Sequence, residues 1–181
     1  MDTSRLLTKD IFEKLGKHDK YYTNERWLHF SEVISLIKQF DKIDNVLEIG
    51  PYKSPFFKNS DIMDIVRYEY PFDINLFIKH DCSKVPFPVD DKKYDLVIAS
   101  QVLEHLGIRG QQVKVFDEIE RISHKAIITL PYKWHVPNFR HHHMIDEKVF
   151  DVWASNREYS TQKIGGNGDF RRILRVYEFL F

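Results

Sequence analysis

Two short apolar runs, each carrying a single carboxylate, constrain the fold of this chain more than any other feature. The first run, Asn45-Val46-Leu47-Glu48-Ile49, ends at Gly50, and the second, Tyr94-Asp95-Leu96-Val97-Ile98-Ala99, ends at Ser100. Runs of this kind are typical of strands in a parallel sheet that is covered on both faces. Ligands of open α/β sheets bind at the carboxyl ends of such strands. The two runs therefore predict a parallel sheet that binds a nucleoside-like ligand at that edge.

Composition indicates one domain, 1–181, and excludes several functions. The 181 residues, 43% of them hydrophobic and 30% charged, suffice for one well-buried core. The 27 basic residues balance the 27 acidic ones and the sequence pI is about 7.1, which argues against a nucleic-acid partner. The single cysteine, Cys82, fits a reducing compartment, and no apolar run is long enough to span a bilayer. We expect a soluble, cytoplasmic protein without a membrane partner.

Residues 1–42 predict an N-terminal helical cap. Thr3-Ser4 precedes several apolar residues, and Gly16 follows them. This order is typical of a short helix with an N-cap at its start and a glycine at its C-terminus. Thr23-Asn24 opens a longer helix, because apolar side chains then recur every three or four residues, at Trp27, Phe30, Val33, Ile34, Ile37 and Phe40. We expect this stripe to face the core, so that the cap covers one face of the sheet or roofs the ligand cleft.

Residues 43–181 predict the sheet core. Strands are expected at 46–49, 61–68, 77–80, 94–99 and 125–130, with helices at 109–122 and 146–153. Two last strands, 159–164 and 172–180, join through a glycine-rich hairpin turn. Pro51 and Pro55 leave little room for a helix after the first strand, so the first crossover is shortened. The predicted fold class is α/β, a Rossmann-like, doubly wound, mostly parallel sheet with a C-terminal antiparallel hairpin.

From about residue 45 to residue 181 the order of these segments resembles that of the class I S-adenosylmethionine-dependent methyltransferases. The segments that carry the resemblance are Val46-Leu47-Glu48-Ile49-Gly50, His80-Asp81, Val85-Pro86-Phe87-Pro88 with Tyr94-Asp95-Leu96-Val97, and Val102-Leu103-Glu104-His105-Leu106. The family's glycine turn usually holds two or three glycines, whereas here Pro51 follows Gly50 directly. The resemblance implies S-adenosyl-L-methionine as the cofactor.

The resemblance also implies which residues bind that cofactor. It places Glu48 and Gly50 along the amino-acid part, with Pro51 and Lys53 in the divergent turn that follows. Lys53 is open to two interpretations, a partner of the cofactor carboxylate or a solvated side chain. The adenine would lie against Asp81 and Cys82, and the sulfonium would lie against Ser100 and Gln101. A role for Cys82 as a small apolar filler is favoured over a reactive thiol.

Two acids compete for the ribose hydroxyls. Glu69 stands 21 positions after Glu48 (69 − 48), close to the spacing of the ribose-binding acid in dinucleotide-binding folds. Asp64 is the alternative, but the apolar pair Ile65-Val66 places it before the predicted end of the second strand. Glu69 is therefore the favoured ribose ligand.

Histidines are the candidate general bases. A neutral imidazole at His105 can accept a proton near neutral pH, although a structural role is favoured there. Four more histidines follow Pro131 in a non-periodic loop where the acceptor is expected to enter, namely His135, His141, His142 and His143. No metal site is predicted, because adjacent histidines on an extended loop point apart and nothing else completes a coordination set.

The sequence favours an enzyme that methylates a small polar acceptor, with a hydroxyl of a sugar or related metabolite as the preferred target and O-methylation as the reaction. The alternative is a catalytically inactive methyltransferase-fold module that binds or regulates. Acids at Glu48, Glu69 and Asp81 count against that alternative, since a carboxylate at a buried strand end is costly without a partner. A third candidate function, metal-dependent hydrolysis, is supported only by the loop that contains the histidines. A second copy of the chain, in a homodimer, is a further candidate partner.

Overall fold

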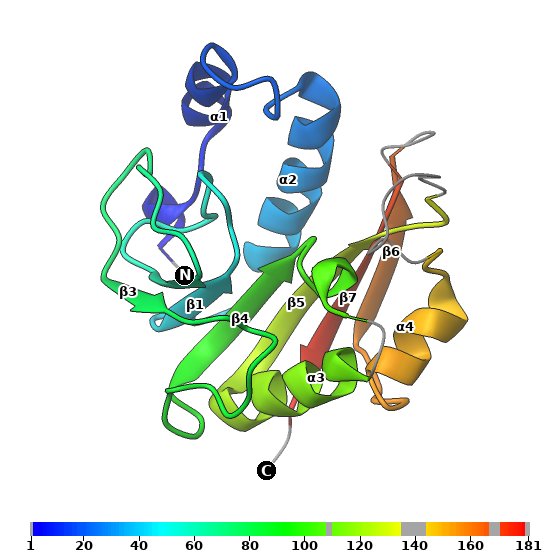
Figure 1. Ribbon diagram of the computed structural model, residues 1–181. Coiled ribbons are helices and arrows are strands. Elements are labelled where there is room, and N and C mark those ends of the chain that lie inside the picture. The colour runs from blue at the N-terminus through cyan, green and yellow to red at the C-terminus, as the bar shows by residue number, and fades with distance from the viewer. Residues whose placement is uncertain (1, 108–109, 135–143, 167–170, 180–181) are drawn as a thin grey trace.

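Seven strands form one sheet in the part of the chain that the computed structural model describes, residues 2–107, 110–134, 144–166 and 171–179. The strands are β1 (Val46–Ile49), β2 (Asp61–Asp64), β3 (Leu76–Lys79), β4 (Tyr94–Ser100), β5 (Ser123–Pro131), β6 (Thr161–Gly165) and β7 (Arg172–Glu178). Their order across the sheet is β3-β2-β1-β4-β5-β7-β6 (Figure 1). The order reverses between β1 and β4, which is the point where open α/β sheets bind ligands.

The first five strands are parallel, and only the C-terminal pair is antiparallel. Val46 of β1 pairs with Leu96 of β4, and Leu96 pairs in turn with Lys125 of β5. β7 runs antiparallel to both β5 and β6. The predicted mostly parallel sheet with a C-terminal antiparallel hairpin is confirmed.

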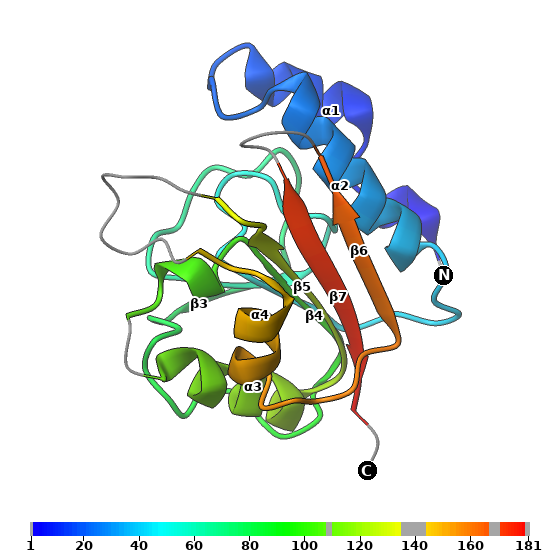
Figure 2. The ribbon, with the colours of Figure 1, turned by 90° about the vertical axis from the view of Figure 1, so that its right-hand side faces the viewer.

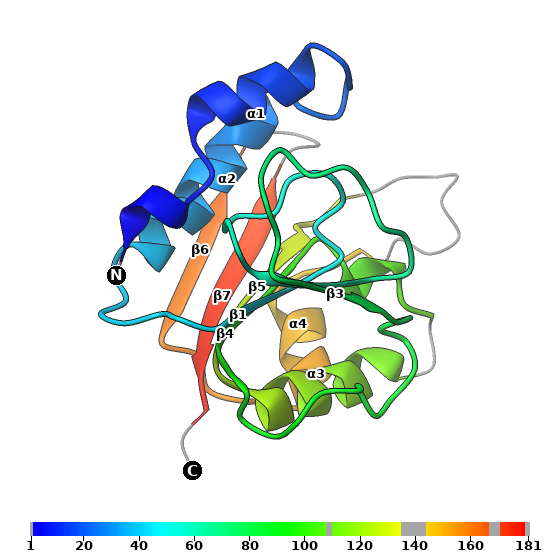
Figure 3. The same ribbon diagram turned by 90° about the vertical axis from the view of Figure 1, so that its left-hand side faces the viewer.

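Helices cover both faces of the sheet. The cap contains a 3-10 turn, η1 (Thr3–Arg5), followed by α1 (Lys9–Gly16) and α2 (Asn24–Ile37); η2 (Leu103–His105) and α3 (Gln111–Ile122) lie between β4 and β5, and α4 (Glu147–Trp153) follows β5. Figures 2 and 3 show α1 and α2 on one side of the sheet and α3 and α4 on the other. None of the helices in the described ranges is long and apolar enough to cross a membrane.

Side-chain alternation along the buried strands explains this layering. Leu96 and Ile98 of β4 pack with the apolar face of α2, which includes Val33 and Ile37. Val97, between them, points to the opposite face and packs with the apolar side of α3. Because successive strand residues face opposite sides, an unbroken apolar strand requires a cover on each. The predicted stripe on α2 supplies one of these covers.

The three connections between β1 and β4, which the structure describes completely, contain no helix. The β1–β2 connection is instead held by the buried carboxylate of Glu48. Its Oε2 accepts a hydrogen bond from the Phe56 backbone N–H at 2.6 Å, and its Oε1 accepts from Phe57 N–H at 2.8 Å and from Ser60 Oγ at 3.1 Å. The predicted shortening of the first crossover is confirmed, and Glu48 ties this connection to β1.

Several predicted boundaries are wrong. The second strand ends at Asp64 rather than at residue 68, because Ile65 and Val66 are 60% and 44% exposed and pack in no core. The N-terminal helix begins at Lys9, where Thr8 is the N-cap, rather than after Thr3. Gly110, at a φ of +70°, is the N-cap of α3, so that helix begins at Gln111.

Candidate functional site

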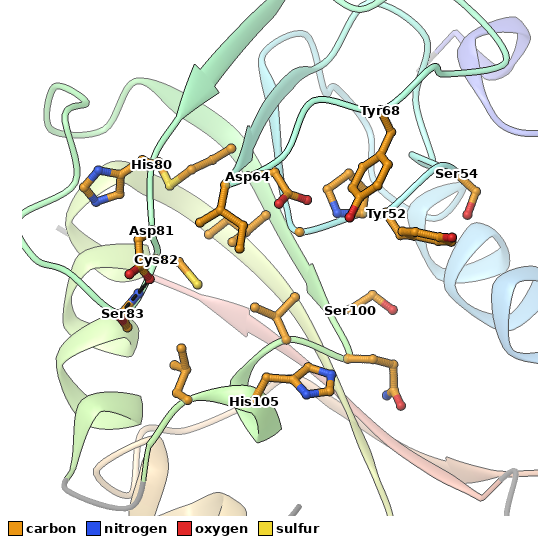
Figure 4. A pocket seen from close by; sticks show the side chains of 18 of the residues that line it. Tyr52, Ser54, Asp64, Tyr68, His80, Asp81, Cys82, Ser83, Ser100 and His105 are labelled. Carbon is orange, nitrogen blue, oxygen red and sulfur yellow. Dashed lines mark hydrogen bonds between the residues drawn. The ribbon is translucent and has the colours of Figure 1, made fainter. Parts of the chain in front are cut away.

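A cavity of about 560 Å³ opens at the carboxyl ends of the first four strands (Figure 4). Each strand contributes its last residue or the residues directly after it, and the polar ones are Asp64, His80, Asp81, Cys82, Ser83, Ser100 and Gln101. Ligand sites of small molecules have volumes of roughly 300–1,000 Å³. The cavity therefore has the size and position of a site for a nucleoside-sized ligand.

The end of β1 forms one wall of the cavity. Gly50 has a φ of +58°, a conformation that favours glycine, and a Cβ there would lie 3.1 Å from Val102 Cγ2. Pro51 and Tyr52 follow it in the lining. Tyr52 packs on Tyr21 of the cap, with 5.3 Å between ring centroids, so the helical cap and the β1 turn meet over this part of the cavity.

Three of the predicted cofactor-binding residues do not line this cavity. The Glu48 carboxylate is bound to the β1–β2 connection. Lys53 Nζ donates to Asp19 Oδ2 at 2.8 Å, and with two further hydrogen bonds this contact lowers the pKa of Asp19 to about 2. Lys53 and Glu69 line a separate hollow of about 990 Å³ beside α1. The Lys53 side chain is 36% exposed and paired with Asp19, and a contact with the cofactor carboxylate stays a prediction.

Asp64 takes the strand-end position that had been assigned to Glu69. It is the last residue of β2, it is partly buried, and it lines the cavity, whereas Glu69 is exposed. Burial raises the pKa of Asp64, although hydrogen bonds from the backbone N–H groups of Val66 and Ile65 oppose that shift. Figure 4 shows Asp64 between the Asp81 side of the cavity and Tyr68.

The segment after β3 forms the far wall. Asp81 Oδ1 accepts hydrogen bonds from the backbone N–H of Ser83 at 3.0 Å and from its Oγ at 2.7 Å, and these contacts lower the pKa of Asp81. Cys82 lies beside this turn. Burial, followed by the charges of Asp81 and Asp64, raises the pKa of its thiol to about 11. At neutral pH the thiol is therefore protonated and weakly nucleophilic.

The end of β4 is tied to β5 and to the cap. Ser100 Oγ lies 2.9 Å from Thr129 Oγ1, and His29 Nε2 of α2 lies 3.3 Å from both oxygens. Gln101 has a φ of +59°, its N–H donates to the Thr129 carbonyl oxygen, and its Nε2 donates to Thr129 Oγ1 at 3.2 Å. Left-handed backbone at a non-glycine residue costs about 1 kcal/mol or more and is frequent at functional sites.

His29 is expected to stay neutral in the folded protein throughout the neutral and mildly acidic range. Burial, and then the charges of Arg172 and Arg26, lower its pKa from 6.5 to about 3. Below pH 6.5 the unfolded chain binds a proton that the folded chain does not, so His29 lowers the free energy of unfolding as the pH falls towards 3.

His29→Gln removes this titration. Relative to the wild type, the variant should gain stability as the pH falls from about 7 to about 5, within the range in which an unfolded histidine titrates. Denaturant unfolding of both proteins at several pH values measures the difference. A difference that stays constant over that range would contradict the assignment.

His105, in η2, lines the cavity on the side of Ser100. Its neighbour Glu104 is 2% exposed, and Glu104 Oε2 has no hydrogen-bond partner among the described residues. Burial raises the pKa of Glu104 to about 8, despite the opposing charge of Arg172. A buried carboxyl group with a raised pKa and one oxygen that has no hydrogen-bond partner in the described ranges is unusual in a protein core.

Sequence reasoning missed Tyr52 in the turn after β1, and it missed the residues that the cap and the last strand bring to this edge, namely Tyr21, Arg26, His29 and Arg172. A weak signal existed, because Arg26 and His29 are three residues apart on a helix whose other side is apolar. No local pattern links them to Arg172.

The four loop histidines, His135, His141, His142 and His143, lie outside the described residues. Within those ranges, no group of three or more histidine, cysteine, aspartate or glutamate side chains is placed to hold a metal ion. The structure therefore adds no metal centre to the site that it describes.

Sheet order, the antiparallel β7 and the cavity at the β1–β4 edge together define the class I S-adenosylmethionine-dependent methyltransferase fold, and solved structures of that fold match this chain. N-methyltransferase NodS from Bradyrhizobium japonicum WM9, in complex with S-adenosyl-L-homocysteine, matches with a TM-score of 0.67 and 13% identity over 93% of this chain and 98% of that one. The PH0226 protein from Pyrococcus horikoshii OT3 matches with a TM-score of 0.60 and 17% identity, over 92% and 99% of the two chains.

Magnesium protoporphyrin IX methyltransferase (ChlM) from Synechocystis PCC 6803, with bound S-adenosylmethionine, matches with a TM-score of 0.58 and 10% identity over 84% of this chain and 78% of that one. No family model and no curated protein matches the sequence. At these identities the similarity shows the shared fold, while the acceptor differs between the proteins that share it.

Proposed function

We propose that this protein is an S-adenosyl-L-methionine-dependent methyltransferase that acts on a small polar acceptor, with a hydroxyl as the preferred target. The observation that carries the proposal is the cavity at the β1–β4 edge, into which Gly50, Asp64, Asp81 and Ser100 are brought by four different strands. Two solved structures of the same fold are described with S-adenosyl-L-homocysteine or S-adenosylmethionine bound. The balanced charge of the chain, 27 basic against 27 acidic residues, supports a small-molecule acceptor.

The residues in the cavity fit such a cofactor. The absence of a side chain at Gly50 leaves room for the methionine part next to the backbone, since a Cβ there would already crowd Val102. Asp64, at the end of the strand next to β1, would supply carboxylate oxygens for the ribose hydroxyls. The turn from Asp81 to Ser83 lines the side of the cavity away from Tyr52 (Figure 4), and the adenine would lie there.

Bound there, the cofactor would supply a methyl group to the acceptor oxygen, with the electron pair of the broken carbon–sulfur bond left on sulfur, and the protein would have to take up the acceptor proton. Ser100 and Gln101 border the end of the cavity where that exchange would occur, and their ties to Thr129 hold this edge in place. Fixed positions of this kind raise the rate because little orientation remains to be lost on reaction.

The base for a hydroxyl acceptor is proposed among the histidines. His105 lines the cavity near Ser100, so its imidazole is a candidate to receive the proton. The histidines at positions 135 and 141–143 stay candidates on the sequence argument. Replacing His105 with alanine is expected to slow turnover about a hundredfold, the lower range of a general-base contribution, and to leave cofactor affinity unchanged. Equal turnover of variant and wild type would exclude His105 as the base.

A binding or regulatory module without catalysis is the second candidate function. The single glycine of the β1 turn favours it, since the family's turn usually has two or three. Isothermal titration with S-adenosyl-L-methionine and S-adenosyl-L-homocysteine is the first test, and we expect saturable 1:1 binding of both. No binding of either would overturn the proposal. Binding, followed by transfer of a labelled methyl group to a hydroxyl acceptor, would exclude the inactive module.

A further inference from the structure

The separate hollow of about 990 Å³ beside α1 adjoins the main cavity. Three segments form it: the C-terminal half of α1 with the turn that follows, Lys53 in the turn after β1, and the segment 67–71 after β2. Tyr68 lines both spaces, and Figure 4 shows it near Tyr52 on one side of the main cavity. The volume is at the upper end of the range for small-molecule sites, roughly 300–1,000 Å³. Because the cofactor would occupy the main cavity, this hollow is open to another ligand.

Basic side chains from two of these segments line the hollow. Lys14 is in the last turn of α1 and Lys17 is its C-cap, so the two lie on the same side of the helix. Arg67 comes from the β2–β3 connection. In the described part of the chain, none of the three forms an ion pair with an acid. The helix C-terminus attracts the two lysines, but Arg67, on another segment, receives no such compensation.

Two acids also line the hollow, and they offset only part of this charge. Asp19 is already engaged, since its Oδ1 accepts from Tyr21 N–H at 2.9 Å. Its Oδ2 accepts from Tyr52 Oη at 2.9 Å and from Lys53 Nζ at 2.8 Å. Glu69 is exposed. The three cations of the preceding paragraph therefore face one carboxylate, a local excess of positive charge in a chain whose 27 basic and 27 acidic residues balance.

Apolar and aromatic side chains supply much of the remaining surface, namely Ile11, Leu15, Tyr22, Tyr68 and Pro71. They give the hollow an area against which an organic group can be buried. Lysine binds phosphate as a point charge, whereas planar paired recognition by arginine is the typical mode for carboxylates. Two lysines and one arginine that approach from two segments therefore suit a tetrahedral phosphate better than a flat carboxylate.

We propose that this hollow binds a small organic phosphate, a phosphate monoester with an aromatic or apolar group, at the same time as the cofactor occupies the main cavity. Lys14, Lys17 and Arg67 hold the phosphate group, and the organic group lies against the rings of Tyr22 and Tyr68. This site goes beyond the proposed methyl transfer, since none of the three cations lines the main cavity.

The test is isothermal titration of the full chain, saturated with S-adenosyl-L-homocysteine, with phenyl phosphate, phthalate and inorganic phosphate. Phenyl phosphate and phthalate are both aromatic dianions in mildly alkaline buffer, so they differ in the kind of anionic group. We expect saturable binding of phenyl phosphate and weaker binding of the other two, because phthalate offers carboxylates and inorganic phosphate lacks a ring. No binding of phenyl phosphate, or tighter binding of either other probe, would overturn the inference.

Variants locate the site. Lys14→Gln, Lys17→Gln and Arg67→Gln are each expected to weaken binding of phenyl phosphate about threefold, since contacts of exposed charges are modest, and the triple variant by more than about tenfold. Lys20→Gln is the matched control, because it removes the same charge from an exposed side chain that does not line the hollow. All four side chains are exposed, so we expect the variants to fold, and thermal melting checks this. An equal loss in Lys20→Gln would show a response to net charge alone and contradict the site.

The same titrations separate failure of this inference from failure of the proposed function. If S-adenosyl-L-homocysteine does not bind, the proposed function is wrong, and phenyl phosphate can still be titrated into the free protein. If S-adenosyl-L-homocysteine binds and displaces phenyl phosphate, the probe lies in the main cavity, and the second site is excluded while the methyltransferase proposal stands.

Discussion

Replacing Glu48 with alanine is expected to lower the free energy of unfolding by about 2–6 kcal/mol, because two buried backbone N–H groups would lose their acceptor. The carboxylate is 1% exposed and accepts hydrogen bonds from two backbone N–H groups and from Ser60. Each buried donor that loses its partner costs about 1–3 kcal/mol. Chemical denaturation followed by circular dichroism measures the loss.

Two further variants sharpen this test. Glu48→Gln keeps the shape of the side chain but presents an NH₂ group to one of the two backbone donors, so we expect an intermediate loss. Glu13→Ala, at an exposed pair with Lys9, should change stability by less than about 0.5 kcal/mol. If Glu48→Ala were as stable as Glu13→Ala, the carboxylate would not hold the β1–β2 connection.

Asp64→Ala is expected to weaken binding of S-adenosyl-L-homocysteine between about tenfold and a hundredfold. A hydrogen bond to a charged group contributes about 1.5–3 kcal/mol, and about 1.4 kcal/mol is a factor of ten. Asp64 ends β2 and lines the cavity, so its loss would remove the acceptor for the ribose hydroxyls. Isothermal titration measures the change.

Glu69→Ala is the matched control, because this acid is close in sequence to Asp64 but lines the separate hollow beside α1. We expect its affinity to equal that of the wild type. The reverse result, with Glu69→Ala impaired and Asp64→Ala unaffected, would restore the assignment favoured by the spacing from Glu48. Thermal melting of both variants shows whether either change acts through the fold.

The strand β1 could be predicted with both its ends, whereas the end of β2 could not. β1 was predicted with its observed bounds, because a short apolar run is typical of a strand that is buried on both faces of a sheet. The end of β2 was predicted four residues too late (68 − 64) because Ile65 and Val66 are apolar and yet exposed. Apolar character predicts burial only on average, and a loop beside a ligand site is one of the exceptions.

Some of the predicted cofactor-binding residues line the cavity and others do not. The glycine at the end of β1 and the polar residues after β3 and β4 line the cavity, since the carboxyl ends of parallel strands share one edge. The resemblance assigns Glu48 to the cofactor, but the partner that a strand side chain meets depends on the segment that packs over its face of the sheet. Here the short β1–β2 connection places two backbone N–H groups within reach of that carboxylate.

The sequence by itself determined the order of the strands and helices, the mostly parallel sheet and the edge at which a ligand would bind, because these depend on periodicity and chain order. Only the tertiary structure decided which side chains meet there. Arg26 and Arg172 come from opposite ends of the chain and lie together because α2 packs on the face of the sheet that contains β7. Side-chain contacts between distant segments follow from packing, and packing leaves no local pattern in the sequence.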